Sequence, residues 1–222
     1  TNVQVYSSIR QDMATIDGAF NSGQGVGLLK GSFEWKDAPR LQLNLKGDNL
    51  LVRQAPLITA IANPNLTLDM YPFDKRLSLK GSVDVPRARI SMPETTAPII
   101  NTSSDVRIVR QGQDPLAILR AAKPWDIRAD ISVNIGKQVI FQGFNSNIPL
   151  VGRLNLSQRG YETAMRANGA IGVSQKVKIE AYGQSLDLNR AIARFNGPLA
   201  NPTLDIDANK NVQGSMLGVR VT

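Results

Sequence analysis

The chain has 222 residues and a formal net charge of +8, because 26 lysines and arginines outnumber 18 acidic residues. It contains no histidine and no cysteine, which excludes a Ser-His-Asp triad, a thiolate metal site and a disulfide framework. No apolar run approaches the roughly eighteen residues of a membrane-spanning helix. The basic excess favours an anionic partner, although solubility alone explains it equally well. No basic stripe interleaved with aromatic residues is present, so we expect no nucleic-acid partner.

Residues 1–27 are the least regular part of the chain, which opens on Thr1 and reads as a fragment of a longer protein. Val3 and Val5 alternate with polar neighbours, and the apolar residues that follow fit either a strand or a helix. The sequence GQGVG at residues 23–27 lacks the G-x-G-x-x-G spacing of a phosphate-binding loop. We expect a flexible turn there.

A Leu-Lys-Gly motif recurs in the next part of the chain and ends at Gly31, Gly47 and Gly81. Each copy is followed, two or three positions later, by an apolar residue. Glycine within a strand marks a bend, a bulge or the close approach of another backbone. Repeated bends at similar positions would curl a sheet. The cleanest period-2 alternation, typical of a strand with one apolar face, covers residues 127–135.

Several proline, glycine and asparagine positions predict that a strand stops or that the chain reverses. They are a helical turn within residues 54–63 stopped at Asn63-Pro64, a strand end at Pro86, a hairpin at Gly136-Lys137 and a tight reversal at Asn189-Arg190. Residues 114–123 follow an N-cap and N1-proline pattern with apolar residues at helical spacing, which predicts a short helix.

Arg87 and Arg89 alternate with Ala88 and Ile90, so the two arginines share one side of the chain. A pair of guanidinium groups at this spacing could grip a phosphate. Solvated charges on a strand edge are the commoner outcome for such residues.

Regular alternation along many strands leaves an apolar face that must be covered. Two packed sheets are the commoner solution, and pattern alone favours such a sandwich. The alternative is one sheet curled so that its apolar face lines a groove. Medium aliphatic residues with few aromatic anchors, and glycines within the strands, favour the groove.

A set of motifs occurs in consistent order along the chain. They are Gly81-x-Val83-x-Val85-Pro86 followed by Ser103-Ser104-Asp105-Val106, then Tyr182-Gly183-Gln184-x-Leu186, Phe195-x-Gly197-Pro198, Asn201-Pro202-x-Leu204-Asp205-Ile206 and Gly218-Val219-x-Val221. With these motifs the chain resembles the C-terminal domain of the TamB family, from residue 28 onward. Residues 1–27 and 114–123 do not contribute to the resemblance.

The resemblance implies a single all-β domain over residues 1–222, with a long, curved, mostly antiparallel sheet rolled into a half-pipe (a β-taco) whose concave face is apolar. It implies a segment of a periplasmic bridge in a diderm bacterium, anchored in the inner membrane by a part of the protein absent from this chain. Such a bridge carries phospholipid acyl chains toward the outer membrane. It also supports the assembly of outer-membrane proteins with a TamA-like partner. No cofactor is implied.

The residues expected to line the groove are aliphatic and alternate along their strands. They are Leu41, Leu43, Leu45, Leu66, Leu68, Leu77, Leu79, Val83, Val85, Ile131, Val133, Ile135, Leu154, Leu156, Val177, Ile179, Leu204 and Ile206. An ordinary sandwich core would use the same residues, so only an open cavity separates the two interpretations.

A second hypothesis assigns the chain to a different class, that of an assembly module. In this hypothesis an exposed strand edge adds a strand of the TamA-like partner or of an unfolded outer-membrane protein, without carrying lipid. The expected edge strand holds Leu217, Val219 and Val221, although Lys210 and Arg220 could instead protect that edge.

An enzyme is the least favoured interpretation. Asp205 and Asp207 lie two residues apart on one strand face, a spacing compatible with acid-base work but also with a solvated polar face. With no histidine in the chain and no base partner for the pair, we expect no catalysis and no metal site.

Overall fold

The computed structural model describes residues 3–92, 124–162, 164–181, 184–212 and 215–221, with the backbone alone at residues 181, 211–212, 215–217 and 219–221. This part of the chain forms fourteen strands and no helix. The helix expected at residues 114–123 lies outside the described residues. The strands are β1 (Val3–Arg10), β2 (Met13–Ser22), β3 (Gly25–Glu34), β4 (Arg40–Asp48), β5 (Leu50–Gln54), β6 (Ile58–Tyr71), β7 (Arg76–Ser91), β8 (Asp126–Gly143), β9 (Ser146–Gln158), β10 (Arg166–Val173), β11 (Val177–Ala181), β12 (Gln184–Pro198), β13 (Thr203–Val212) and β14 (Ser215–Val221).

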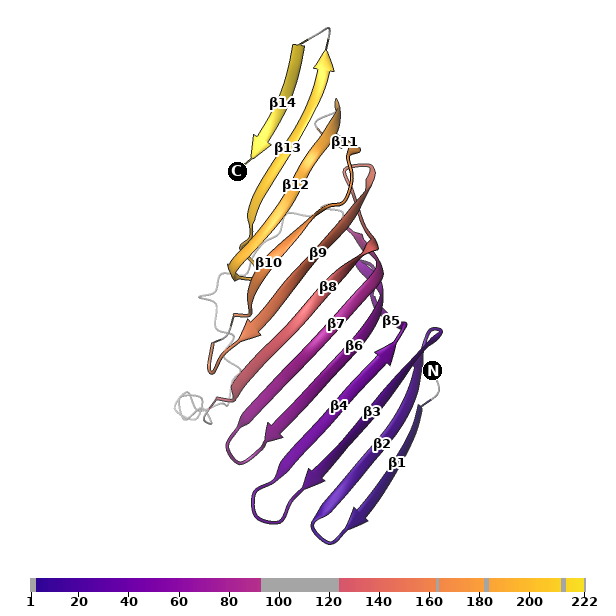
Figure 1. The fold of residues 1–222 in the computed structure, drawn as a ribbon, viewed down its shortest axis with the longest axis vertical. Helices are drawn as coiled ribbons and strands as arrows, with labels where there is room; N and C mark the ends of the chain where they lie inside the picture. Colours follow the sequence, from indigo (N-terminus) through magenta and orange to yellow (C-terminus); the bar gives the residue numbers. More distant parts are fainter. Residues whose placement is uncertain (1–2, 93–123, 163, 182–183, 213–214, 222) are drawn as a thin grey trace, which may run out of the picture.

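All the described strands belong to one open sheet, with β1 at one end and β14 at the other. Figure 1 shows this sheet as a long twisted ribbon that follows the chain from the N-terminal to the C-terminal strands. Neighbouring strands are antiparallel except for β7 and β8, which are parallel. The predicted all-β, mostly antiparallel sheet is therefore confirmed, and its shape is consistent with a half-pipe. The sandwich of two separate sheets is not formed by the described strands.

Two positions in the sheet are each occupied by a pair of short strands placed end to end. β4 and β5 both pair with β6, and β10 and β11 both pair with β12. The first break falls at Asn49, which has a positive φ of 53°. The second break falls at residues 174–176. In both cases the partner is a single long strand that runs past the break.

The long strands carry interruptions of register that line up across the sheet. Register shifts occur at residues 61–63 of β6, 85–87 of β7, 135–139 of β8 and 188–190 of β12. The first three lie on adjacent strands, and the fourth lies opposite the break between β10 and β11. A β-bulge bends its strand and increases the local twist. We call this line of bulges and breaks the crease, because aligned bulges bend the whole sheet.

The helical turn expected within residues 54–63 is not formed, because residues 58–63 belong to β6, and the strand end, hairpin and reversal expected at Pro86, Gly136-Lys137 and Asn189-Arg190 were also wrong. β6 runs through Pro64, β7 runs through Pro86, β8 runs through Gly136-Lys137, and β12 runs through Asn189-Arg190. Each of these positions lies at or next to the crease. Their residue types therefore mark bulges within continuous strands, which also explains why prolines are tolerated there.

Residues 3–22 form the hairpin of β1 and β2, which settles the strand-or-helix alternative in favour of strands. The expected turn is confined to Gly23 and Gln24, and Gly25 already begins β3. The three Leu-Lys-Gly motifs lie within β3, β4 and β7. At the third motif, Gly81 has a φ of +139°, and an added Cβ would overlap the carbonyl oxygen of Asn65. This copy therefore marks a close approach of two backbones, as expected for glycine inside a strand.

Several of the most buried apolar side chains lie beside the crease on one face of the sheet. Val139 is only 2% exposed, and Leu50, Ala62 and Ala88 are also buried there. Nearby, Ile148, Leu188 and Ala208 form a cluster whose contacts come from β8 to β13. The turn between β8 and β9 bonds to β11, where the Ser146 hydroxyl donates to the carbonyl oxygen of residue 178 at 2.6 Å. β11 thus lies beside the start of β9, in the sheet position that β10 occupies further along.

Candidate functional site: one apolar face of the sheet

The register brings all the residues expected to line a groove to one face of the sheet, because directly paired residues point to the same side. In the N-terminal half, Leu43 pairs with Leu68, which pairs with Leu79. In the middle of the sheet, Val133 lies between Val83 and Leu154. The same relation continues to the C-terminal strands. There the pairs are Leu154 with Gly169, Gly169 with Phe195, Ala193 with Leu204, Ala191 with Ile206, Val177 with Leu188 and Ile179 with Leu186. We call this side of the sheet the apolar face.

The expected lining residues are mostly half-buried. Of the eighteen, Leu154 is buried at 6% exposure and Leu204 is exposed at 43%, which leaves sixteen of intermediate exposure. Side chains in the core of a sandwich would be covered by the opposite sheet. Half-buried aliphatic side chains on one face instead leave apolar surface available to another molecule.

The apolar face extends beyond the residues that the sequence singled out. On β2 it continues through Ile16 and Phe20, whose positions pair with the apolar side of β3. On β1 it continues through Val5 and Ile9, whose positions pair with that same side of β2. Val5 and Ile9 are 60% and 72% exposed. The alternation of Val3 and Val5 was the available signal, but the looser spacing of the residues that follow concealed the rest of β2.

The expected partner edge is placed at one end of the sheet. β14 pairs with β13 and with no other described strand. The backbone positions Leu217, Val219 and Val221 pair with Lys210, Ala208 and Ile206. The opposite end of the sheet is β1, all of whose residues are exposed. The sheet therefore offers two strand edges with unpaired backbone groups among its described strands.

The other side of the sheet carries polar side chains that bond across strands. Arg40 donates to Asp69 at 3.0 Å, and this hydrogen bond is the main cause that raises the pKa of Arg40 above its ordinary value. Similarly, the hydrogen bond to Asp126 raises the pKa of Arg128. Each of these arginines thus has a carboxylate partner within the protein. We call this side the polar face.

The carboxylate pair considered for catalysis lies on this polar face. Asp205 pairs with Arg190 at 3.0 Å and Arg194 at 3.1 Å, and its side chain is 15% exposed. Asp205 therefore acts as an ion-pair partner for two arginines on the neighbouring strand. Nothing in this arrangement provides the pair Asp205 and Asp207 with a base partner.

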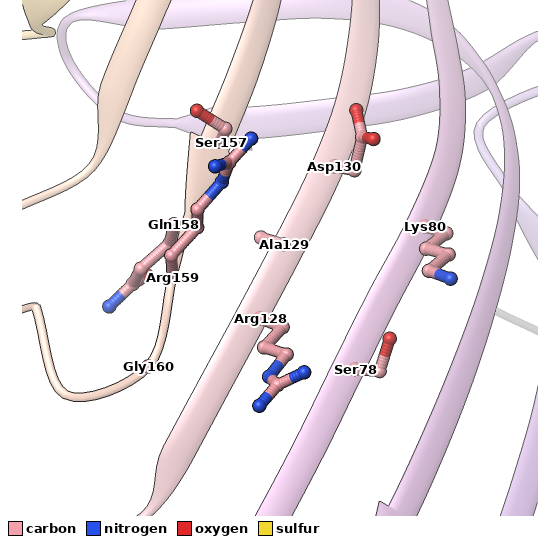
Figure 2. Close-up of a pocket in the computed structure, with 9 residues that line it drawn as sticks. All are labelled: Ser78, Lys80, Arg128, Ala129, Asp130, Ser157, Gln158, Arg159 and Gly160. Carbon is pink, nitrogen blue, oxygen red and sulfur yellow. The ribbon is translucent and has the colours of Figure 1, made fainter.

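A hollow of about 590 Å³ lies on the polar face, between β7, β8 and the end of β9. Figure 2 shows the residues that line it. It holds Lys80, Arg128 and Arg159, together with the carboxylate of Asp130. Arg128 is already bonded to Asp126 at 2.9 Å. The positive charges of this hollow are thus partly neutralised by carboxylates of the protein itself. Within the described ranges no group of three or more acidic residues is placed to hold a metal ion. The same residues include no helix long and apolar enough to cross a membrane.

One open sheet with a continuous aliphatic face and a polar back places the chain in the class of β proteins built on a single one-sided apolar sheet. The model of the TamB C-terminal domain matches residues 14–222, and the chain belongs to this family. The match begins within β2, earlier than residue 28. The translocation and assembly module subunit TamB of Haemophilus influenzae is 26% identical over 214 residues. That similarity covers 92% of this chain and 16% of the relative, so the chain spans about a sixth of the relative's length.

Proposed function

We propose that this domain is part of a TamB-like bridge across the periplasm, in which the apolar face shields phospholipid acyl chains from water. The observation that carries the proposal is the placement of all eighteen aliphatic residues on one half-buried face of a single sheet. Membership of the TamB family supports a role in a translocation and assembly module.

The energetic requirement for lipid passage is large. Each methylene group kept out of water is worth about 0.8 kcal/mol, so a chain of about sixteen carbons left wet costs on the order of 10 kcal/mol. An aliphatic groove removes this penalty without any covalent step. The head group stays in water at the open side of the groove, so no specific polar pocket is needed and no catalysis is proposed.

The proposed setting follows from the family. The complete protein is anchored in the inner membrane by a segment outside this chain, and the domain works in the periplasm. Its partners are phospholipid acyl chains, a TamA-like outer-membrane protein and unfolded outer-membrane proteins during their assembly.

Native mass spectrometry of the purified chain tests the lipid proposal directly. We expect phospholipid to copurify and to leave the protein when neutral detergent competes for the apolar face. A chain that binds no phospholipid from mixed vesicles, although circular dichroism shows an intact sheet, would contradict the proposal.

The exposed edges of the sheet favour β-augmentation as a second candidate function. β14 and β1 each pair with one described neighbour only, and Val3 and Val5 on β1 are about 60% exposed. An edge strand of this kind accepts a strand from another protein through backbone hydrogen bonds.

Removal of residues 215–222 separates the two candidates. If edge pairing at β14 is the function, the truncated chain loses binding to a TamA-like partner in a surface-immobilised assay and retains copurified phospholipid. If the truncated chain binds that partner as well as the full chain does, pairing through β14 is excluded.

A further inference from the structure

A second hollow on the polar face lies at the crease and carries concentrated positive charge. Its volume is about 740 Å³, and residues of β5, β6, β7 and β8 line it. Four of the lining residues are cations, namely Arg53, Arg87, Arg89 and Lys137, and none is acidic. We call it the crease hollow. Its size falls within the range of small-ligand sites.

The four cations of the crease hollow make no ion pair with any described residue. Arg87 donates from Nε to the side-chain oxygen of Gln138 at 3.1 Å, which leaves its terminal nitrogens available. Arg40 and Arg194, elsewhere on the polar face, each bond to a carboxylate on a neighbouring strand. The hollow in Figure 2 also holds an acidic residue. The crease hollow differs from these two arginines and from the hollow in Figure 2, because its cations have no carboxylate partner among the described residues. Its positive charge is therefore available to an external anion.

The register places the three arginines around one small area. Arg87 and Arg89 are two residues apart on β7, about 7 Å along the strand. Arg53 and Arg89 both pair with Thr59, from opposite sides of β6, so their backbones lie about 10 Å apart. Arginine side chains are long enough to converge over such a triangle. Their planar forks match the oxygens of a phosphate group better than a point charge does.

Aliphatic side chains stand beside these cations. Leu51, Ile61 and Ile140 also line the crease hollow. A smaller hollow of about 400 Å³ adjoins it and shares Leu51, Ile61 and Arg87. The site therefore combines guanidinium groups with apolar walls, which suits a phosphate carried on a partly apolar molecule.

We propose that the crease hollow binds the phosphate group of an anionic phosphate ester on the side of the sheet opposite the apolar face. The group has two possible sources, a phospholipid head group and a soluble phosphate ester, which have the same charge chemistry. This site is independent of acyl-chain binding, because its three arginines lie at register positions on the side opposite the apolar face.

The test compares the 222-residue chain with a triple variant, Arg53→Gln, Arg87→Gln and Arg89→Gln. Binding is measured by cosedimentation with phosphatidylcholine vesicles, with and without added phosphatidylglycerol, and by calorimetry with glycerol 3-phosphate. Each cation near an anionic surface contributes to the affinity for that surface. Loss of three cations should therefore weaken binding to the anionic vesicles by roughly a hundredfold. Higher salt should weaken binding by the unmodified chain more than by the variant.

A matched control removes the same charge elsewhere on the polar face, through Lys46→Gln, Arg166→Gln and Lys178→Gln. All three positions are exposed, and none lines the crease hollow. Loss confined to the hollow variant supports the site. Loss with anionic vesicles alone assigns it to a lipid head group, and loss with glycerol 3-phosphate assigns it to a soluble ester.

Three results would overturn the proposal. The first is an equal loss in both triple variants, which would mean that overall charge governs binding. The second is unchanged binding in the hollow variant. The third is displacement by polyglutamate at the same concentration as by glycerol 3-phosphate, because the hollow would then select charge and not phosphate. Phospholipid copurification with the hollow variant is measured separately and reports only on the apolar face.

Discussion

Val133→Asp is the sharpest single test of the apolar face. Val133 lies near the middle of the sheet, half-buried on β8, with Val83 and Leu154 as its partners on the two flanking strands. An acyl chain that crosses one strand covers about 4.8 Å, the length of about four methylene groups. Losing their dry contact costs about 3 kcal/mol. Partial desolvation of an unpaired carboxylate adds about 1–3 kcal/mol. The local affinity for a chain should therefore fall by roughly a thousandfold or more.

The assay follows labelled phospholipid from the inner to the outer membrane in cells that carry the substitution in the complete protein. We expect passage to fall strongly while circular dichroism of the purified domain stays unchanged, because Val133 is not fully buried. Ser132→Asp is the control. It adds the same charge one position along β8 on the polar face, where the Ser132 hydroxyl bonds to Asn155 at 2.9 Å, and it should leave passage intact. Normal passage with Val133→Asp in a folded protein would refute lipid transport along this face.

Other substitutions test the fold by chemical denaturation. Gly169→Ala should lower the free energy of unfolding by about 1–3 kcal/mol, because Gly169 has a φ of +132° and an added Cβ would overlap a carbonyl oxygen of β9. Gly197→Ala is the control, because a Cβ added there meets no atom within 4 Å, and it should change the free energy of unfolding by less than about 0.5 kcal/mol. Equal effects of the two substitutions would contradict the close approach at Gly169. Val139→Ala should cost about 2 kcal/mol because this side chain is 2% exposed. Leu204→Ala, at a position 43% exposed, should lower the free energy of unfolding by less than about 1 kcal/mol. A larger loss for Leu204→Ala than for Val139→Ala would contradict the assigned core. Asp205→Ala should lower the free energy of unfolding by about 1 kcal/mol, because it removes the partner of two arginines. The contribution of these ion pairs to the salt dependence of stability should be lost with it. Stability that is insensitive to this change would show that the ion pairs contribute nothing.

Period-2 alternation was sufficient to predict the apolar face. The side-chain period of a strand is two, so the alternation that identified Leu41 to Leu45 or Ile131 to Ile135 also fixed which side they share. What alternation does not encode is the pairing between strands. Leu154 and Leu156 pair with Gly169 and Ala167, and alternation does not mark these two small residues as partners of leucines.

The crease was concealed because its residues are those that also build turns. Pro64, Pro86, Gly136 and Asn189 are of types that end strands or reverse the chain in most contexts. Here each lies inside a strand whose backbone pairing resumes beyond it. Whether such a residue makes a turn or a bulge depends on the strand available next to it, which local sequence does not reveal. The crease hollow shared this limitation, since Arg53 and Arg89 come together only through the register of β6.

The parallel ladder between β7 and β8 has a consequence for how the domain assembles. Every other link in the sheet joins strands that are close along the chain, whereas Leu77 pairs with Ile127, fifty positions away. The N-terminal run of hairpins and the C-terminal run can each zip up locally, and their union must await closure of a long stretch of polypeptide. That union is the slow step of folding, so backbone amides along this seam should gain protection last in pulsed hydrogen exchange, after the outer hairpins on both sides.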